Sequence, residues 1–130
     1  MVIKRFPSTP NTQPEPTSSP GEKLLGINRL GLIVEQIRRD AKNVVLCHGV
    51  FDLLHMGHVR HLNEAKSHGD VLIVSITADA FVNKGPGKPV FSENLRAEML
   101  SSLAVVDYVT INRTPDAEDL LEVLQPDVYV

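Results

Sequence analysis

The sequence predicts an α/β fold, a Rossmann-like, doubly wound sheet of parallel strands. From residue 27 onward, short apolar runs alternate with segments in which apolar residues recur at helical spacing. The run 71–77 is apolar almost throughout, which is typical of a strand buried on both faces. The chain has 130 residues, of which 42% are hydrophobic and 22% are charged, and this suits one soluble globular domain.

Composition argues against several functional classes. The net charge of −3 gives no basic excess for nucleic acid or an anionic membrane. Cys47 is the single cysteine, so no internal disulfide can form, and a cytoplasmic location is expected. No apolar run reaches the roughly 18 residues of a membrane span. No apolar core follows Lys4 and Arg5, so we expect no signal peptide.

Residues 1–20 differ in composition from the rest of the chain. They contain five of the nine prolines, with Ser, Thr, Asn and Gln between them. Such a segment cannot bury enough apolar surface to fold, so we predict a disordered Pro-rich tail. The predicted domain then covers residues 21–130.

Apolar periodicity and capping residues place the individual elements of this domain. Helices are expected over 27–40 and 58–68, and after Ser92 and Thr114, each of which is expected to cap a helix. The predicted inward residues of the last two helices are Leu95, Met99, Leu103, Leu120, Leu121 and Leu124. Strands are expected over 44–48, 71–77 and 108–111, and from residue 128.

Single helices between consecutive strands predict parallel pairing with right-handed crossovers. In the usual strand order 3-2-1-4-5, the fourth strand lies beside the first. Ligands of such sheets bind outside the carboxyl ends of the strands, where the order reverses. The candidate functional segments are therefore 48–58 and 77–88, which follow the first and second strands.

The first of these segments carries the strongest chemical pattern. Gly49 permits a tight turn, and His55 and His58 stand three residues apart at a predicted helix start, with Gly57 leaving space between them. Three interpretations follow from the spacing. The histidines hold the phosphates of a nucleoside triphosphate, or they ligate zinc together with Asp52, or they are surface or capping residues without chemistry.

Residues 49–58 resemble the Gly-x-Phe-Asp-x-x-His-x-Gly-His signature of the cytidylyltransferase-like nucleotidyltransferases. The wider run 44–130 resembles the adenylyltransferase half of ADP-heptose synthases and the glycerol-3-phosphate cytidylyltransferases. The resemblance implies that a sugar or polyol phosphate attacks the α-phosphorus of a nucleoside triphosphate and that pyrophosphate leaves. It also implies Mg²⁺ bound with the triphosphate, and it favours ATP with a heptose-like sugar phosphate. The rival within the class is CTP with glycerol 3-phosphate.

The resemblance also assigns residue roles. His55, His58 and Lys84 become the catalytic contacts to phosphate. The expected nucleotide-binding residues are Gly49, Val50, Phe51, His55, Gly57, His58 and Arg96, and the expected acceptor-binding residues are Asp52 and Asp79.

Each weaker assignment has an alternative. Phe51 could simply pack in the core. Asp52 could orient the loop or take part in metal binding, and Asp79 could cap a helix. Lys84 could be a solvated loop residue, and Arg96 could form a surface ion pair with Glu93. The expectation for Lys88, Arg60 and His61 is solvent exposure, and for Cys47 burial in a strand.

One part of the family pattern is missing from this sequence. The resemblance implies a second signature, an Ile-Ser-Ser-Thr-like stretch with a basic residue, and none is present up to Val130. We therefore expect a C-terminally incomplete domain. This leaves open a module that binds nucleotide without turnover, while a metal-dependent hydrolase built on His55 and His58 has the least support. A homodimer is the family expectation, and a fused or separate sugar kinase domain is compatible with it.

Overall fold

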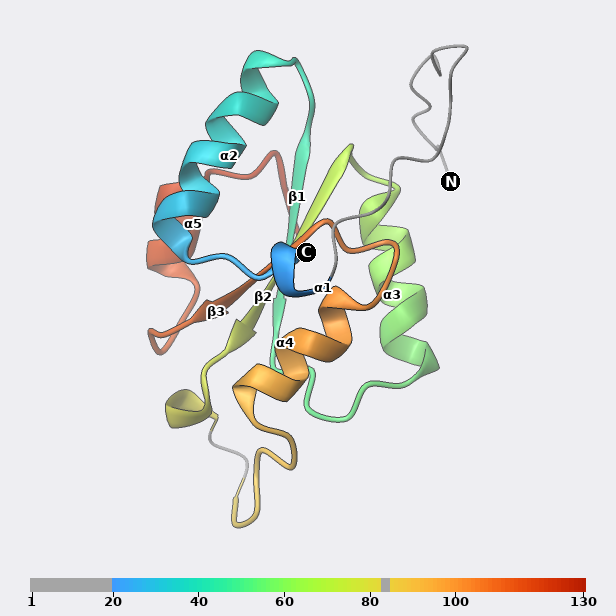
Figure 1. Cartoon of the computed structure of the whole chain (residues 1–130), viewed down its shortest axis with the longest axis vertical. Helices are drawn as coiled ribbons and strands as arrows, with labels where there is room; N and C mark the ends of the chain where they lie inside the picture. Colours follow the sequence, from blue (N-terminus) through green and yellow to red (C-terminus); the bar gives the residue numbers. More distant parts are fainter. Residues whose placement is uncertain (1–19, 83–84) are drawn as a thin grey trace.

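The computed structural model describes residues 20–82 and 85–130, and it builds them around a parallel sheet (Figure 1). The strands are β1 (Val44–Gly49), β2 (Val71–Thr77), β3 (Tyr108–Asn112) and β4 (Val128–Tyr129). Their order is β3-β2-β1-β4, and all neighbours are parallel, which confirms the predicted fold class and order. The order reverses between β1 and β4, so the ligand crevice of such a sheet lies at their carboxyl ends.

Helices cover both faces of the sheet. They are α1 (Pro20–Lys23), α2 (Ile27–Arg39), α3 (Met56–Lys66), the 3₁₀ turn η1 (Asp79–Phe81), α4 (Glu93–Ser101) and α5 (Glu118–Leu124). Figure 1 shows α2 and α5 side by side on one face, while α3 and α4 lie on the other. Within the described residues, no helix is both long and apolar enough to cross a membrane.

The alternation of side chains along β1 divides the core into two parts. Val45 and Cys47 face α3 and α4, whereas Val44 and Leu46 face α2 and α5. All four side chains are buried, as expected for a central strand covered on both faces. The site at the end of β1 therefore rests on a rigid, doubly covered strand.

The fourth helix corrects a sequence prediction. Leu95 is 49% exposed and Met99 is only partly buried, so the predicted inward face is wrong for these two residues, although Leu103 does pack against the core. The residues that α4 buries are Arg96, Ala97, Leu100 and Ser101. The helix is rotated because the Arg96 guanidinium finds hydrogen-bond acceptors inside the protein.

The start of α5 is a second correction. Thr114 does not cap the helix, which begins four residues later at Glu118. Its hydroxyl instead hydrogen-bonds Asn112 Oδ1 (3.0 Å) and the carbonyl of Asp116 (2.8 Å). The Asp116 carboxylate accepts from the Glu118 N–H at 3.0 Å and so satisfies one of the free donors at the helix start. The predicted tail lies outside the described residues, except for Pro20, which begins α1.

Candidate active site

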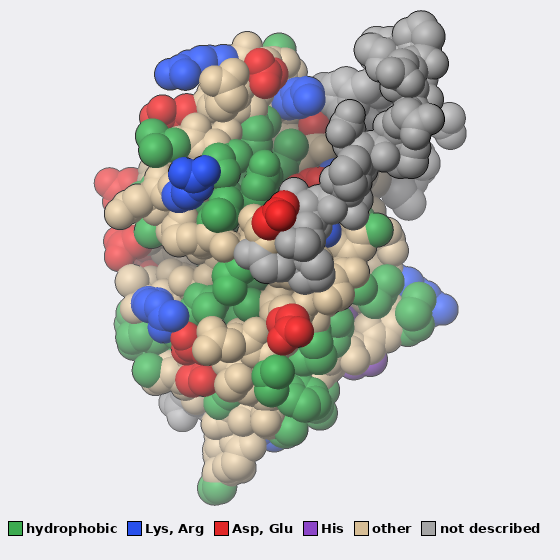
Figure 2. Space-filling view, viewed as in Figure 1, with side chains coloured by type: hydrophobic (Ala, Val, Ile, Leu, Met, Phe, Trp, Pro, Cys, Tyr) green, Lys and Arg blue, Asp and Glu red, His purple; other side chains and the backbone are tan. Residues whose placement is uncertain are grey.

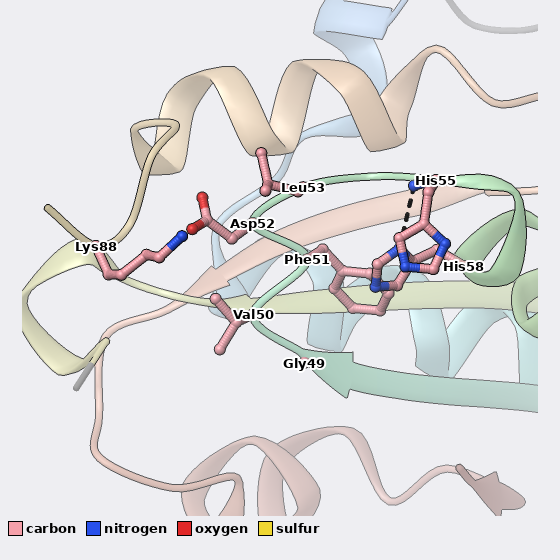
Figure 3. Close-up of a pocket in the computed structure, with 8 residues that line it drawn as sticks. All are labelled: Gly49, Val50, Phe51, Asp52, Leu53, His55, His58 and Lys88. Carbon is pink, nitrogen blue, oxygen red and sulfur yellow. Dashed lines mark hydrogen bonds between the residues drawn. The ribbon is translucent and has the colours of Figure 1, made fainter. Parts of the chain in front are cut away.

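A cavity of about 490 Å³ opens at the carboxyl end of β1, between this strand and the start of α3 (Figure 3). Most of its wall comes from the signature loop between the two elements. The lining residues are Gly49, Val50, Phe51, Asp52, Leu53, His55, His58 and Lys88. The structure thus brings six of the predicted site residues together at the edge where a doubly wound sheet binds its ligand.

His55 and His58 together cap the N-terminus of α3. Nδ1 of His55 accepts from the Gly57 N–H at 3.0 Å, and Nδ1 of His58 accepts from the His55 N–H at 3.2 Å. This reciprocal capping box explains why α3 begins at Met56, two residues before the predicted start. The ring centroids lie 4.1 Å apart, and the side chains stand beside each other in Figure 3.

The cap also determines which nitrogen of each ring carries the proton. A neutral imidazole has one donor nitrogen and one acceptor nitrogen. Because both Nδ1 atoms accept, the proton of each neutral ring lies on Nε2. Burial lowers the pKa of His58 below its ordinary value, and the nearby charges of His55 and His61 lower it further. The helix start therefore presents two Nε2–H donors beside its own positive dipole end, an arrangement that binds anions.

Two glycines make room for this geometry. A Cβ at Gly57 would lie 2.7 Å from Cε1 of His55, so only glycine lets that ring fold over the helix start. A Cβ at Gly49 would lie 2.9 Å from the Phe51 ring. Phe51 is 7% exposed and packs in the core, and its ring centroid lies 5.6 Å from that of His58. Phe51 therefore supports the histidines from below and also lines the cavity.

The turn of the loop falls at Phe51 rather than at a glycine. Phe51 has φ = 53°, in the left-handed region that favours glycine, whereas Gly49 ends β1 in strand conformation. A non-glycine residue in this region costs about 1–2 kcal/mol, so neighbouring contacts must hold it there. These contacts come from the residues on either side, Val50 and Asp52.

Asp52 fastens the loop to the segment before α4. Its Oδ2 accepts from the Val90 N–H at 2.9 Å, and its Oδ1 accepts from the Phe91 N–H at 3.0 Å. These two hydrogen bonds hold the pKa of Asp52 below its ordinary value, with help from the charges of Lys88 and Arg96. The predicted loop-orienting role of Asp52 is thereby observed, and its contact with an acceptor stays a prediction.

Arg96 is the buried centre of the loops around the cavity. The side chain is 0% exposed, Nη1 donates to the carbonyls of Val50 (2.9 Å) and Thr77 (2.7 Å), and Nε donates to that of Phe91 (3.0 Å). Nη2 donates to Oδ1 of Asp79 at 2.6 Å. With these donors engaged inside the protein, Arg96 acts on the cavity by positioning its wall, and its predicted contact with a nucleotide has no support in this geometry.

The surface ion pair predicted as the alternative for Arg96 is wrong. Glu93 pairs with Arg113 instead, at 2.7 Å between Oε2 and Nη1, and its Oε1 accepts from the Asp79 N–H at 3.0 Å. Asp79 begins the 3₁₀ turn η1 rather than capping it, and its carboxylate faces Arg96. The acceptor-binding role of Asp79 stays a prediction.

The remaining candidates are Lys84, Arg60, His61 and Cys47, together with the zinc interpretation of the histidines. Lys84 lies outside the described residues. Arg60 and His61 are exposed on α3, as expected, and Cys47 is buried, where desolvation raises the pKa of its thiol to about 11. Among residues 20–82 and 85–130, no three His, Cys, Asp or Glu side chains converge as a metal site, so the zinc interpretation of His55, His58 and Asp52 is not supported.

Lys88 is exposed in its loop, as predicted, and it also lines the cavity, which the sequence analysis did not predict. Figure 3 shows its side chain directed toward Asp52. The signal that could have found it is the Gly-Pro-Gly segment before it, because Gly85 and Gly87 both have positive φ and turn the chain back toward the site. Elsewhere, on the face shown in Figure 2, acidic and basic side chains are interspersed rather than gathered by sign.

The parallel sheet, the reversal of strand order beside β1 and the histidine-capped helix start fit a doubly wound domain of the nucleotidyltransferase class. Residues 46–130 match the family model described as cytidylyltransferase-like. The chain belongs to this family, which confirms the resemblance found in the signature loop.

Similar proteins support the same assignment. The bifunctional protein HldE of Syntrophotalea carbinolica is 40% identical over 100 residues, which cover 75% of this chain and 20% of that protein. HldE of Azotobacter vinelandii is 39% identical over 109 residues, covering 82% and 23%. The chain thus spans about a fifth to a quarter of the length of these relatives. The crystal structure of the lipopolysaccharide core biosynthesis protein of Thermoplasma volcanium superposes with a TM-score of 0.63 at 34% identity, covering 68% of this chain and 72% of that one.

Proposed function

We propose that the chain transfers a nucleotidyl group from a nucleoside triphosphate, with ATP favoured, to a sugar phosphate and releases pyrophosphate. The observation that carries the proposal is the histidine cap of α3. Both rings line one cavity at the reversal of the strand order, and because each Nδ1 is engaged in the cap, the Nε2–H groups are the ring donors left for a ligand. Phosphate groups are the ligands that such a helix start favours.

In the proposed reaction, an oxygen of the sugar phosphate attacks the α-phosphorus while the bond to the leaving pyrophosphate breaks. No covalent enzyme intermediate is needed. The Nε2–H groups of His55 and His58 would stabilise charge on the phosphoryl oxygens, and Lys88 adds a cation at the opposite wall. The Arg96 and Asp52 contacts hold this wall in place before the ligand arrives, which favours catalysis by positioning.

Mg²⁺ would enter this site with the triphosphate and neutralise phosphate charge there. Such an ion keeps several waters and takes one or two carboxylates plus phosphate oxygens, so it needs no dedicated protein cage. Asp52 is the one carboxylate on the described cavity wall, and both of its oxygens already accept backbone N–H groups. The donor set fits a cation held mainly by the nucleotide, with Asp52 as the protein group available to it.

The choice of substrates rests on resemblance. The relatives are named bifunctional proteins HldE, and a solved neighbour is named for lipopolysaccharide core biosynthesis, which favours a heptose-like sugar phosphate over glycerol 3-phosphate with CTP. A kinase domain, fused or separate, would supply such a phosphorylated sugar. A homodimer and a cytoplasmic location remain part of this proposal.

The test is pyrophosphate release. The protein is incubated with Mg²⁺, each of the four common ribonucleoside triphosphates, and a panel that includes heptose 1-phosphate, glucose 1-phosphate and glycerol 3-phosphate. We expect pyrophosphate with ATP and a sugar 1-phosphate, and its loss in the double variant His55→Asn/His58→Asn. The control variant is His68→Asn, because His68 lies just beyond the C-terminal end of α3, away from the cap.

The other outcomes discriminate among the rivals. Release with CTP and glycerol 3-phosphate favours the cytidylyltransferase. Nucleotide binding by calorimetry without any release favours a binding module. Turnover that survives loss of both histidines contradicts their proposed roles.

A further inference from the structure

One face of the sheet changes from apolar to polar just before it reaches the cavity. On the side of α2 and α5, Leu46, Ile73 and Tyr108 stand in register across β1, β2 and β3. Two residues further toward the carboxyl ends, the same face carries His48, Ser75 and Thr110, again in register. Apolar residues are usual where a sheet packs against helices, so packing alone does not explain this polar row.

Two residues of this row are buried, and its hydrogen-bonding groups are only partly paired. Ser75 and Thr110 are 0% and 1% exposed. Among the described residues, the Thr110 hydroxyl oxygen is buried without a hydrogen-bond partner. His48 Nδ1 and Ser75 Oγ lie 2.6 Å apart, which holds the imidazole against the sheet. Within the described part of the chain, Nε2 of His48 has no hydrogen-bond partner, and the ring is only half-buried.

His48 stands at the crevice that the proposed function uses. It directly precedes Gly49, which lines the cavity, and β1 is the strand at which the order reverses toward β4. His55 and His58 approach the end of β1 from the α3 face, whereas His48 projects on the opposite face. A substrate that extends from the phosphate donors across the end of β1 would therefore meet His48 with its non-phosphate part.

We propose that His48, oriented by Ser75, hydrogen-bonds a sugar hydroxyl of the bound substrate through Nε2. This inference rests on the proposed function. A hydroxyl both donates and accepts, so it pairs with Nε2 whichever ring nitrogen of neutral His48 carries the proton. The hydroxyl has two sources, the ribose of the nucleotide and the sugar of the acceptor, and the experiment below distinguishes them.

The experiment follows the imidazole NMR signals of all five histidines in the protein labelled with ¹³C and ¹⁵N at histidine. Signals are assigned with single His→Asn variants. The protein is titrated separately with Mg²⁺–tripolyphosphate, Mg²⁺–ATP and glucose 1-phosphate. We expect tripolyphosphate to shift His55 and His58 alone. His48 should move in addition with ATP if it meets ribose, or with glucose 1-phosphate if it meets the acceptor, and His68 serves as the unshifted reference.

The failures of the two proposals differ. If His55 and His58 move with ATP while His48 moves in no titration, the present inference is overturned and the proposed function stands. If no histidine moves with ATP, both fall. An equal shift of His48 with tripolyphosphate would overturn the assignment to a hydroxyl.

Variants separate ligand contact from a structural link between β1 and β2. For the ligand that moves His48, we expect His48→Phe to raise Kd about tenfold, as for one lost hydrogen bond, with partial rescue in His48→Asn. Ser75→Ala should raise this Kd by an intermediate factor, because the His48 imidazole loses the hydrogen bond that orients it. The Kd for tripolyphosphate should stay unchanged, and a parallel rise for tripolyphosphate would assign His48 a structural role only.

Discussion

The Arg96 guanidinium, which has no exposed surface, donates to the Asp79 carboxylate at 2.6 Å between Nη2 and Oδ1. The Asp79 side chain is 42% exposed, so this ion pair joins the interior to the surface. Together with the carbonyls of Val50, Thr77 and Phe91, Asp79 makes Arg96 the common partner of three chain segments. The wall of the candidate site thus depends on a residue that does not line it.

Replacing Arg96 by lysine should destabilise the protein by about 3–5 kcal/mol, because a buried carbonyl group left without its donor costs about 1–3 kcal/mol and Arg96 serves three of them. A lysine ammonium cannot reproduce the planar fork that spans these acceptors, so conservation of charge should not rescue the fold. Urea unfolding measures the change. The matched control is Arg39→Lys on the exposed end of α2, which should change the stability by less than about 0.5 kcal/mol. An Arg96→Lys protein as stable as this control would contradict the prediction.

Gly57→Ala should separate stability from anion binding. The new methyl group would collide with the His55 ring, and the lost cap costs about 1 kcal/mol. Alanine regains about the same amount as a better helix former, so the unfolding free energy should change little. The displaced ring should weaken tripolyphosphate binding about tenfold, measured by calorimetry. In Gly26→Ala, the added methyl group meets no atom within 4 Å, so this control should bind like the parent.

Asp52→Ala should release the segment before α4 from the signature loop. The variant removes the acceptor of both the Val90 and the Phe91 N–H, so hydrogen exchange at these two amides should accelerate, and Asp52→Asn should have a smaller effect. Exposed Asp40→Asn is the control.

The lowered pKa of Asp52 adds a pH dependence to this contact. A carboxylate with a lowered folded-state pKa contributes stability above its unfolded pKa and loses it as pH falls through the folded one. Protection of the Val90 and Phe91 amides should therefore persist below about pH 4, the ordinary range of aspartate. Loss of protection already above that range would contradict the prediction.

The free energy of unfolding should rise with pH between about 5 and 7. His48 and His58 both have lowered pKa values because burial disfavours their charged forms. The unfolded chain therefore binds more protons in this window, and stability increases as pH rises through it. Denaturation of the parent, His58→Asn and His68→Asn at several pH values checks the prediction, since only the first variant should flatten the slope. An unchanged slope in His58→Asn would refute the assignment.

Cys47 should resist alkylation in the folded protein. Its pKa of about 11 leaves about one thiolate in ten thousand molecules at neutral pH, and the side chain is 1% exposed. The rate of labelling by a thiol reagent, read by mass spectrometry, should therefore follow the unfolding equilibrium across a urea series. Rapid labelling without urea would show that the end of β1 opens locally.

Local patterns predicted those features that depend on neighbouring residues. The apolar run 71–77 became β2 with the predicted bounds, and Ser92 caps α4, accepting from the Leu95 N–H. The spacing of His55, Gly57 and His58 located the cavity because all three lie in one turn of chain.

Features that depend on distant partners escaped prediction. An arginine between a leucine and an alanine is usually exposed, and nothing near Arg96 in sequence reveals that Val50, 46 residues away, supplies a carbonyl for it. The contacts of Asp52 were equally hard to predict, since its partners are backbone N–H groups 38 and 39 residues away. Thr114 failed as a cap because its hydroxyl had better-placed acceptors in its own loop.

Because histidines cap α3, the start of this helix is sensitive to low pH. Protonation would give each imidazole a full positive charge toward phosphate, but it would also turn Nδ1 from an acceptor into a donor. The N–H groups of Gly57 and His55 would then lose their acceptors, and the first turn of α3 would be destabilised. The lowered pKa of His58 therefore favours the neutral form that keeps the cap intact. At this residue, the proton that would attract phosphate would also remove a hydrogen-bond acceptor from the start of α3.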